Sequence, residues 1–347
     1  MDHPVISVDV MGGDHGPDVI LNGIEKALVQ RSGARFLLFG DEQIVGPALT
    51  RRPRVKSAST LTHCDMSVAM DAKPSVALRQ GRKVSSMWQA IEAVKSGAAQ
   101  ACISAGNTGA LMAMSKVVLR TVPGIERPAI VAVWPTIRGR SVVLDVGATI
   151  GGPASQYAQF AVMGAAYGRA IFNISNPSIG LLNIGVEDVK GTDSVREAAN
   201  LLTRSDLNFT GFIEGDGIGR GDADVIVTDG FTGNIALKTA EGTARQIAEY
   251  LRQAMGGSIF SRIGYIFAHT AFRNLRQRMD PAAANGGMFL GLNGIVVKSH
   301  GGADAGGFAA AVALAVDVVD ADISQTIAAD IEKMQLLLDD AGAQTLD

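Results

Sequence analysis

Short apolar runs alternate along the chain with longer segments rich in alanine and leucine. The short runs contain many β-branched residues and do not alternate apolar with polar positions, which is typical of strands buried on both faces. The predicted strands are Val5–Val10, Arg35–Phe39, Ala101–Ser104, Ala129–Trp134, Ser141–Val146, Ile179–Ile184 and Val225–Thr228. The predicted helices are Asp18–Gln30, Ser85–Lys95, Ser155–Ala170, Asp193–Thr203 and Asn234–Gln253.

Strands that alternate with helices predict a mostly parallel sheet covered on both faces, which is a three-layer α/β/α fold. No repeat or linker divides the chain, so we expect one α/β/α domain over residues 1–347. Ligands of such sheets bind beyond the carboxyl ends of the strands. We therefore expect the glycine-rich turns that follow the strands to gather along one edge of the sheet.

Residues 247–288, from Ile247 to Met288, are expected to form an inserted amphipathic helical hairpin. Its apolar face is predicted to hold Ile259, Phe260, Ile263, Ile266, Phe267 and Leu275, with Arg262, His269, Arg273, Arg276 and Arg278 beside it. Such a face suits a membrane surface, but it equally suits packing on the protein's own core or on a dimer partner.

The composition is that of a globular protein, with 47% hydrophobic and 19% charged residues. The net charge of −3 gives no bulk field that would attract nucleic acid. Cys64 and Cys102 lie in dissimilar contexts without metal-type spacing, so we expect neither a disulfide nor a zinc site. The first ten residues lack the basic and apolar regions of a secretion signal, and no apolar run is long enough for a membrane span, so we expect a cytoplasmic protein.

One strand-to-helix turn has the clearest chemistry. An apolar run from Cys102 enters a small polar turn and then helix-forming residues up to Met112. Glycines allow close backbone approach to a ligand, and the first N–H groups of a helix favour an anion. The predicted ligand contacts are Ser104, Gly106, Asn107 and Thr108. The alternative is a turn that only joins a strand to a helix.

A second glycine-rich turn, residues 9–17, follows the first predicted strand. Gly12 and Gly13 permit close approach of the backbone to a ligand. Asp9 and Asp14 are suited to orienting donors, although capping of the next helix alone would explain one of them.

A pair of serines begins the predicted helix Ser85–Lys95 just after three cations. The residues are Arg79, Arg82, Lys83, Ser85 and Ser86. Hydroxyls at a helix start behind cations suit a phosphate, so Ser85 is a predicted ligand contact. A solvated charged surface is the alternative interpretation.

Three further turns complete the set. Lys190 precedes Gly191 after one strand, Asn234 is expected at the entry of a helix after another, and Lys298 and His300 follow a later apolar run. Each alone suits an ordinary surface turn, but together with the others they favour one convergent anion site.

Several common catalytic motifs are absent from the sequence. There is no G-x-x-x-x-G-K-[ST], no G-x-G-x-x-G, no G-x-S-x-G and no H-E-x-x-H. We therefore expect no cofactor and no metal.

Six motifs occur in order, and together they resemble one known family. They are VDVMGGDHGP at 8–17, SAGNTGALM at 104–112, LDVGA at 144–148, LLNIG with a later KG at 181–191, DGFTGN at 229–234 and KSHG at 298–301. The chain resembles PlsX, the acyl-ACP:phosphate acyltransferase family of bacterial phospholipid synthesis. The resemblance implies a fold similar to phosphotransacetylases and isocitrate-dehydrogenase-like enzymes.

The resemblance also implies a reaction and partners. The expected reaction moves a long-chain fatty acyl group from acyl carrier protein to inorganic phosphate, and a glycerol-3-phosphate acyltransferase then uses the acyl phosphate. A homodimer and peripheral membrane association through the helical hairpin are implied as well.

Within this reaction we assign Lys190 to electrostatic stabilisation and Asn234 to hydrogen bonding at the reacting centre. The turns at Gly12–Asp14 and Ser104–Thr108 are expected to hold phosphate through backbone N–H groups, with Lys298 and His300 as supporting donors. Two alternatives stay open: a phosphotransacetylase-like enzyme that uses acyl-CoA, and a non-catalytic membrane-docking scaffold.

Overall fold

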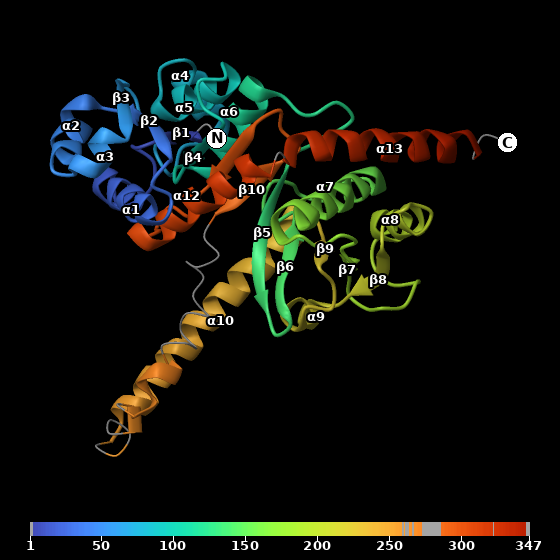
Figure 1. Ribbon diagram of the computed structural model, residues 1–347. Coiled ribbons are helices and arrows are strands. Elements are labelled where there is room, and N and C mark those ends of the chain that lie inside the picture. Colours follow the sequence, from blue (N-terminus) through green and yellow to red (C-terminus); the bar gives the residue numbers. More distant parts are fainter. Residues whose placement is uncertain are drawn as a thin grey trace.

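The computed structural model describes residues 3–258, 260, 264–265, 267–272, 286–321 and 323–344, with side chains up to residue 334. The strands are β1 (Val5–Asp9), β2 (Arg35–Gly40), β3 (Ser59–His63), β4 (Ala101–Ser104), β5 (Ala129–Thr136), β6 (Gly139–Leu144), β7 (Ile179–Leu182), β8 (Phe209–Ile213), β9 (Val225–Val227), β10 (Gly287–Leu290) and β11 (Ile295–Lys298). Within the described residues they form one 11-stranded sheet in the order β3-β2-β1-β4-β11-β10-β5-β6-β9-β7-β8 (Figure 1).

The helices lie on both faces of this sheet. They are α1 (Pro17–Gln30), α2 (Glu42–Thr50), α3 (Pro53–Ser57), α4 (Pro74–Gly81), α5 (Ser86–Lys95), α6 (Thr108–Leu119), α7 (Ala154–Phe172), α8 (Asp193–Thr203), α9 (Gly215–Arg220), α10 (Gly230–Gly256), α12 (Ala305–Asp320) and α13 (Ile323–Gln344). Every predicted strand and helix is observed, with ends that differ by a few residues. Four strands were not predicted. The edge strands β3 and β8 carry polar residues at their exposed positions and resemble loops. The other two, β10 and β11, are short central strands of four residues each.

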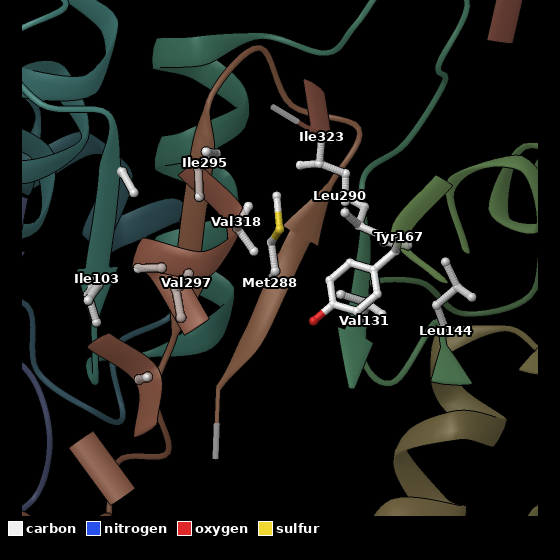
Figure 2. Close-up of a cluster of buried hydrophobic side chains, with 14 of the residues drawn as sticks. Ile103, Val131, Leu144, Tyr167, Met288, Leu290, Ile295, Val297, Val318 and Ile323 are labelled. Carbon is white, nitrogen blue, oxygen red and sulfur yellow. The ribbon is translucent and has the colours of Figure 1, made fainter. Parts of the chain in front are cut away.

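Two apolar clusters, one on each face of the sheet, confirm the three-layer α/β/α fold. In β4, Ile103 packs into the first cluster with α1, α7, α12 and α13, while its neighbour Cys102 packs into the second with α4, α5, α6 and α9. Successive strand residues point to opposite faces, so this division follows from the pleat. Figure 2 shows side chains of the first cluster on adjacent strands, from Ile103 on β4 to Leu144 on β6.

Three antiparallel pairs in the middle of the sheet reverse the direction of its second half. β10 runs antiparallel to both β11 and β5, and β5 runs antiparallel to β6, whereas the strands outside this segment pair in parallel. The carboxyl ends of β6, β9 and β7 therefore point opposite to those of β1, β4 and β11. The expectation that all glycine-rich turns gather along one edge of the sheet is wrong, although the sheet is mostly parallel.

α10 extends away from the sheet as a long arm (Figure 1). The expected insertion boundary at Ile247 falls inside this helix, which begins at Gly230. Phe260 and Phe267 are exposed, and Ile259, Ile263, Ile266 and Leu275 lie outside the described residues, as do Arg262, Arg273, Arg276 and Arg278. The hairpin and the single-domain interpretation stay predictions. In the part of the chain that the structure describes, no helix combines the length and the apolar character needed to cross a bilayer.

Candidate active site

Three neighbouring strands end in polar residues that lie in register. β4 pairs in parallel with β1 on one side and with β11 on the other, so that Ser104 lies opposite both Asp9 and Lys298. All three residues are the last of their strands. The pairing of the sheet therefore brings together three of the residues predicted from the sequence.

Asp9 forms the buried base of this cluster. One carboxylate oxygen accepts a hydrogen bond from Ser86 Oγ and the other from Ser104 Oγ, both at 2.7 Å. Burial raises the pKa of Asp9, and the two hydroxyl donors oppose that rise. Asp9 does not cap α1, because Gly16 holds that position. Its role is to fix two serines, and through Ser104 the turn that follows β4.

The turns after β1 and β4 lie directly against each other. A Cβ on Gly12 would stand 2.7 Å from the Gly106 nitrogen, which leaves no room for a side chain at Gly12. Gly13 has a φ of 95°, a left-handed conformation that favours glycine. Asp14 is exposed, and its N–H donates to Gly301 O at 2.9 Å, so the turn after β11 joins the other two.

The N-terminus of α6 opens into this cluster. Asn107 caps the helix, with Oδ1 accepting from Ala110 N at 2.9 Å. Its Nδ2 donates to Met70 O and Ala72 O, so the side chain anchors the turn and does not offer free donors as predicted. The cap leaves the N–H groups of Thr108 and Gly109 without an intrahelical acceptor. These two amides are suited to an anion.

A half-buried cation faces the same turns. Lys298 Nζ lies 3.4 Å from Ala105 O, and it also donates to Ser299 O. Burial lowers the pKa of Lys298 to about 8, with Asp14 opposing the change. At neutral pH this lysine is still mostly protonated.

His300 connects the cluster to the second half of the sheet. Its Nδ1 accepts from Gly302 N at 3.1 Å, and its Nε2 lies 3.4 Å from Nζ of Lys238 on α10. Burial lowers the pKa of His300, and the Lys238 charge adds to the shift, so the ring is uncharged near pH 7. Lys238 was not predicted, because nothing local in the sequence indicates this contact.

A buried carboxylate, Asp145, organises the turn that follows β6. Oδ1 accepts from the N–H groups of Ile130, Gly147 and Ala148 at 2.9–3.0 Å, and Oδ2 accepts from Thr149 Oγ1 at 2.9 Å. Burial raises the pKa of Asp145, and these donors oppose the rise. Asp145 was missed as a functional candidate although it lies in the LDVGA motif.

The same turn supports the start of α10. Thr149 Oγ1 accepts from Gly230 N at 3.0 Å. A Cβ on Gly233 would stand 2.0 Å from Asp145 O, so only glycine lets the helix pack this closely. The geometry of the Asp145 turn therefore determines where α10 begins.

Asn234 lies one turn inside α10 and not at its entry. Asp229 is the N-cap and accepts from the N–H groups of Phe231 and Thr232. The prediction of Asn234 at the helix entry is thus wrong, and the Asp-Gly-Phe-Thr sequence after a strand was the available cap signal.

Two observations place Asn234 near the cluster. Its Oδ1 lies 3.7 Å from the position of a Cβ on Gly147. It also shares a helix face with Lys238 four residues later, and Lys238 reaches His300. The α10 helix therefore carries Asn234 toward the turns of the first half of the sheet.

Two predicted residues lie apart from this arrangement. Lys190 is exposed in the turn after β7, and its side chain lies near Gly185 of the same turn. β7 pairs with β9, so this turn leaves the sheet next to the one that carries Asp229. Ser85 is fully buried, caps α5 and donates to Gly81 O at 2.9 Å, so the prediction that it contacts a ligand is wrong. The adjacent Ser86 faces Asp9 instead.

Comparison with known proteins gives a consistent result. Residues 5–326 match the protein family described as "Fatty acid synthesis protein". The chain is 57% identical to the phosphate acyltransferase of Parvibaculum lavamentivorans, over 95% of this chain and 92% of the relative. It is 60% identical to that of a Chelativorans species, over 90% and 91%.

Solved structures show the same fold at low identity. The EutD phosphotransacetylase from Staphylococcus aureus superimposes with a TM-score of 0.58 at 16% identity, covering 93% of this chain and 94% of that one. A phosphotransacetylase from Streptococcus pyogenes gives 0.57 at 20% identity, covering 95% and 94%.

The fold is therefore that of the phosphotransacetylases, with a cluster of amides and a half-buried lysine at the ends of adjacent strands. The chain belongs to the PlsX family of phosphate acyltransferases, enzymes of fatty acid and phospholipid synthesis. Membership of an enzyme family overturns the alternative of a non-catalytic scaffold.

Proposed function

We propose that this enzyme transfers a long-chain fatty acyl group from the thioester of acyl carrier protein to inorganic phosphate. A phosphate oxygen attacks the thioester carbonyl carbon, a C–O bond forms and the C–S bond breaks. The proton of the hydrogen phosphate dianion moves to the departing sulfur, so the products are acyl phosphate and a thiol. A glycerol-3-phosphate acyltransferase would then consume the acyl phosphate.

The observation that carries this proposal is the register of three strand ends beneath three glycine-rich turns. Lys298 supplies a positive charge there, and α6 supplies the amides of Thr108 and Gly109. This combination suits an oxyanion with several acceptor oxygens. Phosphate is itself a nucleophile and a thioester is already activated, so the reaction needs no covalent enzyme intermediate.

In this scheme Asn234 donates a hydrogen bond to the oxyanion that develops on the carbonyl, and Lys190 stabilises the same charge. Support for Asn234 comes from its position between the Asp145 turn and the Lys238–His300 contact. Lys190 must approach from the neighbouring turn when substrate binds. Catalytic hydrogen bonds commonly tighten only in the complex with substrate.

The same proposal includes a homodimer and docking of the protein on a membrane surface through the α10 arm. Support comes from the large apolar side chains exposed along it. They are Phe231, Ile235, Ile247 and Tyr250 on α10, and Phe260 and Phe267 follow beyond its end. A long acyl chain, which partitions into membranes, fits such docking better than a short one.

The direct test is a thioester-consumption assay with and without inorganic phosphate, with mass detection of acyl phosphate. Long-chain acyl carrier protein is expected to be consumed only when phosphate is present, and acetyl-CoA should be a poor donor. Rapid use of acetyl-CoA with no use of acyl carrier protein would instead establish the phosphotransacetylase-like alternative.

Two variants test the residue assignments. Lys190→Ala and Asn234→Ala should each stay folded and lower kcat by roughly two to three decades, the usual effect of losing one oxyanion donor. Lys56→Ala and Asn208→Ala are matched controls, because both residues are exposed and lie away from the cluster. Near-normal kcat in both Lys190→Ala and Asn234→Ala would refute the assignments without refuting the reaction.

A further inference from the structure

A groove runs along one side of α6, from the proposed phosphate site at Thr108 toward Lys116. It has a volume of about 210 Å³. The lining residues, mostly small or apolar, are Thr108, Gly109, Met112, Ala113, Lys116, Ile130, Gly147 and Ala148. One wall is therefore α6, and the other is β5 with the Asp145 turn.

The inner end of this α6 groove adjoins the proposed reacting centre. Thr108 and Gly109, which line it, carry the amides that are proposed to bind phosphate. Gly147, on the opposite wall, lies next to Asn234 Oδ1. A substrate carbonyl held at Asn234 would thus have the inner end of the groove beside it.

The outer end of the groove is marked by a single cation. Lys116 is exposed, and among the described residues its side chain forms no ion pair or hydrogen bond. It lies eight residues along α6 from Thr108, which corresponds to about 12 Å of helix. An apolar channel of this length that ends in a cation suits a linear chain that ends in an anion. The fatty acyl chain of the donor fits less well, because it carries no anionic group that could pair with Lys116.

The size of the groove argues in the same direction. Pockets that enclose a whole small molecule have volumes of roughly 300–1,000 Å³. At about 210 Å³ the α6 groove fits a narrow segment of a larger substrate. A thioester donor carried on a flexible arm presents such a segment.

Resting on the proposed function, we infer that the α6 groove binds the phosphopantetheine arm of the thioester donor, with the thioester at Asn234 and the phosphodiester at Lys116. This arm is shared by acyl carrier protein and coenzyme A, so the groove recognises the chemistry common to both. Lys116 contributes to donor binding and does not touch the reacting atoms.

The test compares two synthetic donors, an acyl-phosphopantetheine and the acyl-pantetheine that lacks the phosphate. The native enzyme should show a KM about three- to tenfold lower for the phosphorylated donor, the range expected for an exposed charge-assisted contact. Lys116→Gln should reduce that ratio to about one without changing kcat, whereas Lys116→Arg should keep it. Lys56→Gln on α3 is the matched control, because Lys56 is also exposed but lies away from the groove, and it should retain the native ratio.

A second variant tests the channel independently of charge. Ala113→Phe should fill the groove and raise the KM of both donors while the KM for phosphate stays unchanged. Repeating the Lys116→Gln measurement with acyl carrier protein and with acyl-CoA shows which source the enzyme uses through this groove.

The outcomes separate the two proposals. An equal KM for the two synthetic donors in the native enzyme, or an unchanged ratio in Lys116→Gln, overturns the assignment of the groove. Absence of phosphate-dependent thioester consumption with every donor overturns the proposed function itself.

Discussion

Replacing Asp145 with asparagine tests whether one buried carboxylate sets the position of Asn234. The carboxylate accepts hydrogen bonds from Ile130, Gly147, Ala148 and Thr149, and Thr149 in turn holds the first residue of α10. Asp145→Asn preserves the shape of the side chain, but it places an NH2 group where Oδ2 accepts from Thr149 Oγ1 at 2.9 Å and from Ala148 N at 3.1 Å, so two donors would face each other at Ala148.

The expected change in the free energy of unfolding follows from these hydrogen bonds. Charge-assisted hydrogen bonds contribute roughly 1.5–3 kcal/mol and neutral ones roughly 0.5–1.5 kcal/mol, so the substitution weakens several contacts and loses one. Removing a buried charge offsets part of that loss. We expect a net destabilisation of about 2 kcal/mol and a decrease in Tm of about 4 °C. A shift of about 1 Å in the catalytic geometry lowers kcat by roughly a hundredfold.

The assay measures Tm by calorimetry together with kcat and the KM for phosphate. Asp145→Asn should lower kcat about a hundredfold and change the KM for phosphate much less, because Lys298 and the amides of Thr108 and Gly109 are carried by β11 and α6 and not by α10. Asp224→Asn is the matched control. Asp224 accepts from Ser178 N and Oγ at the opposite end of β9, so its replacement should lower Tm without lowering kcat. Equal losses of kcat in both variants, or a normal kcat in Asp145→Asn, would refute the positioning role.

Two other predictions concern the cation and the packing of α10. Because the pKa of Lys298 is about 8, the lysine loses its charge as pH rises through that value, and kcat/KM for phosphate should fall about tenfold per pH unit above it. Lys298→Arg, which stays charged, should remove this decline, and a decline that persists would exclude Lys298 as its source. Gly233→Ala places a Cβ 2.0 Å from Asp145 O and should destabilise the protein by about 3 kcal/mol or more. Gly242→Ala on the same helix meets no atom within 4 Å and should raise the Tm, since alanine is the better helix former. Equal Tm values for the two variants would contradict the packing argument.

The layers of the fold were predictable because their signals are local. Buried strands such as Ala101–Ser104 and helices such as Asp193–Thr203 appear at the predicted positions, since apolar runs and helical spacing are properties of neighbouring residues. The reversal of the second half was not predictable in the same way. It depends on β10, a strand late in the chain that inserts between β11 and β5, and pairing direction is a long-range property.

The candidate site shows the same division. Polar turns after apolar strands identified Asp9, Ser104 and Lys298, and strand pairing then brought them into register. Which of two adjacent serines faces the site was not decidable, because a one-residue step on a helix turns a side chain by about 100°. Lys238 could not be identified from the sequence, because its contact with His300 joins residues far apart in the chain.

α10 is anchored at one end, where Gly230 and Gly233 pack closely against the Asp145 turn. Its 27 residues span about 40 Å, so a tilt of about 5° at the base sweeps the far end through about 3.5 Å but moves Asn234 by only about 0.5 Å. A small tilt about the base therefore displaces the far end several times more than it displaces the Asn234 amide. The residue proposed for catalysis thus lies at the anchored end of α10, and the surface proposed for docking lies toward its far end.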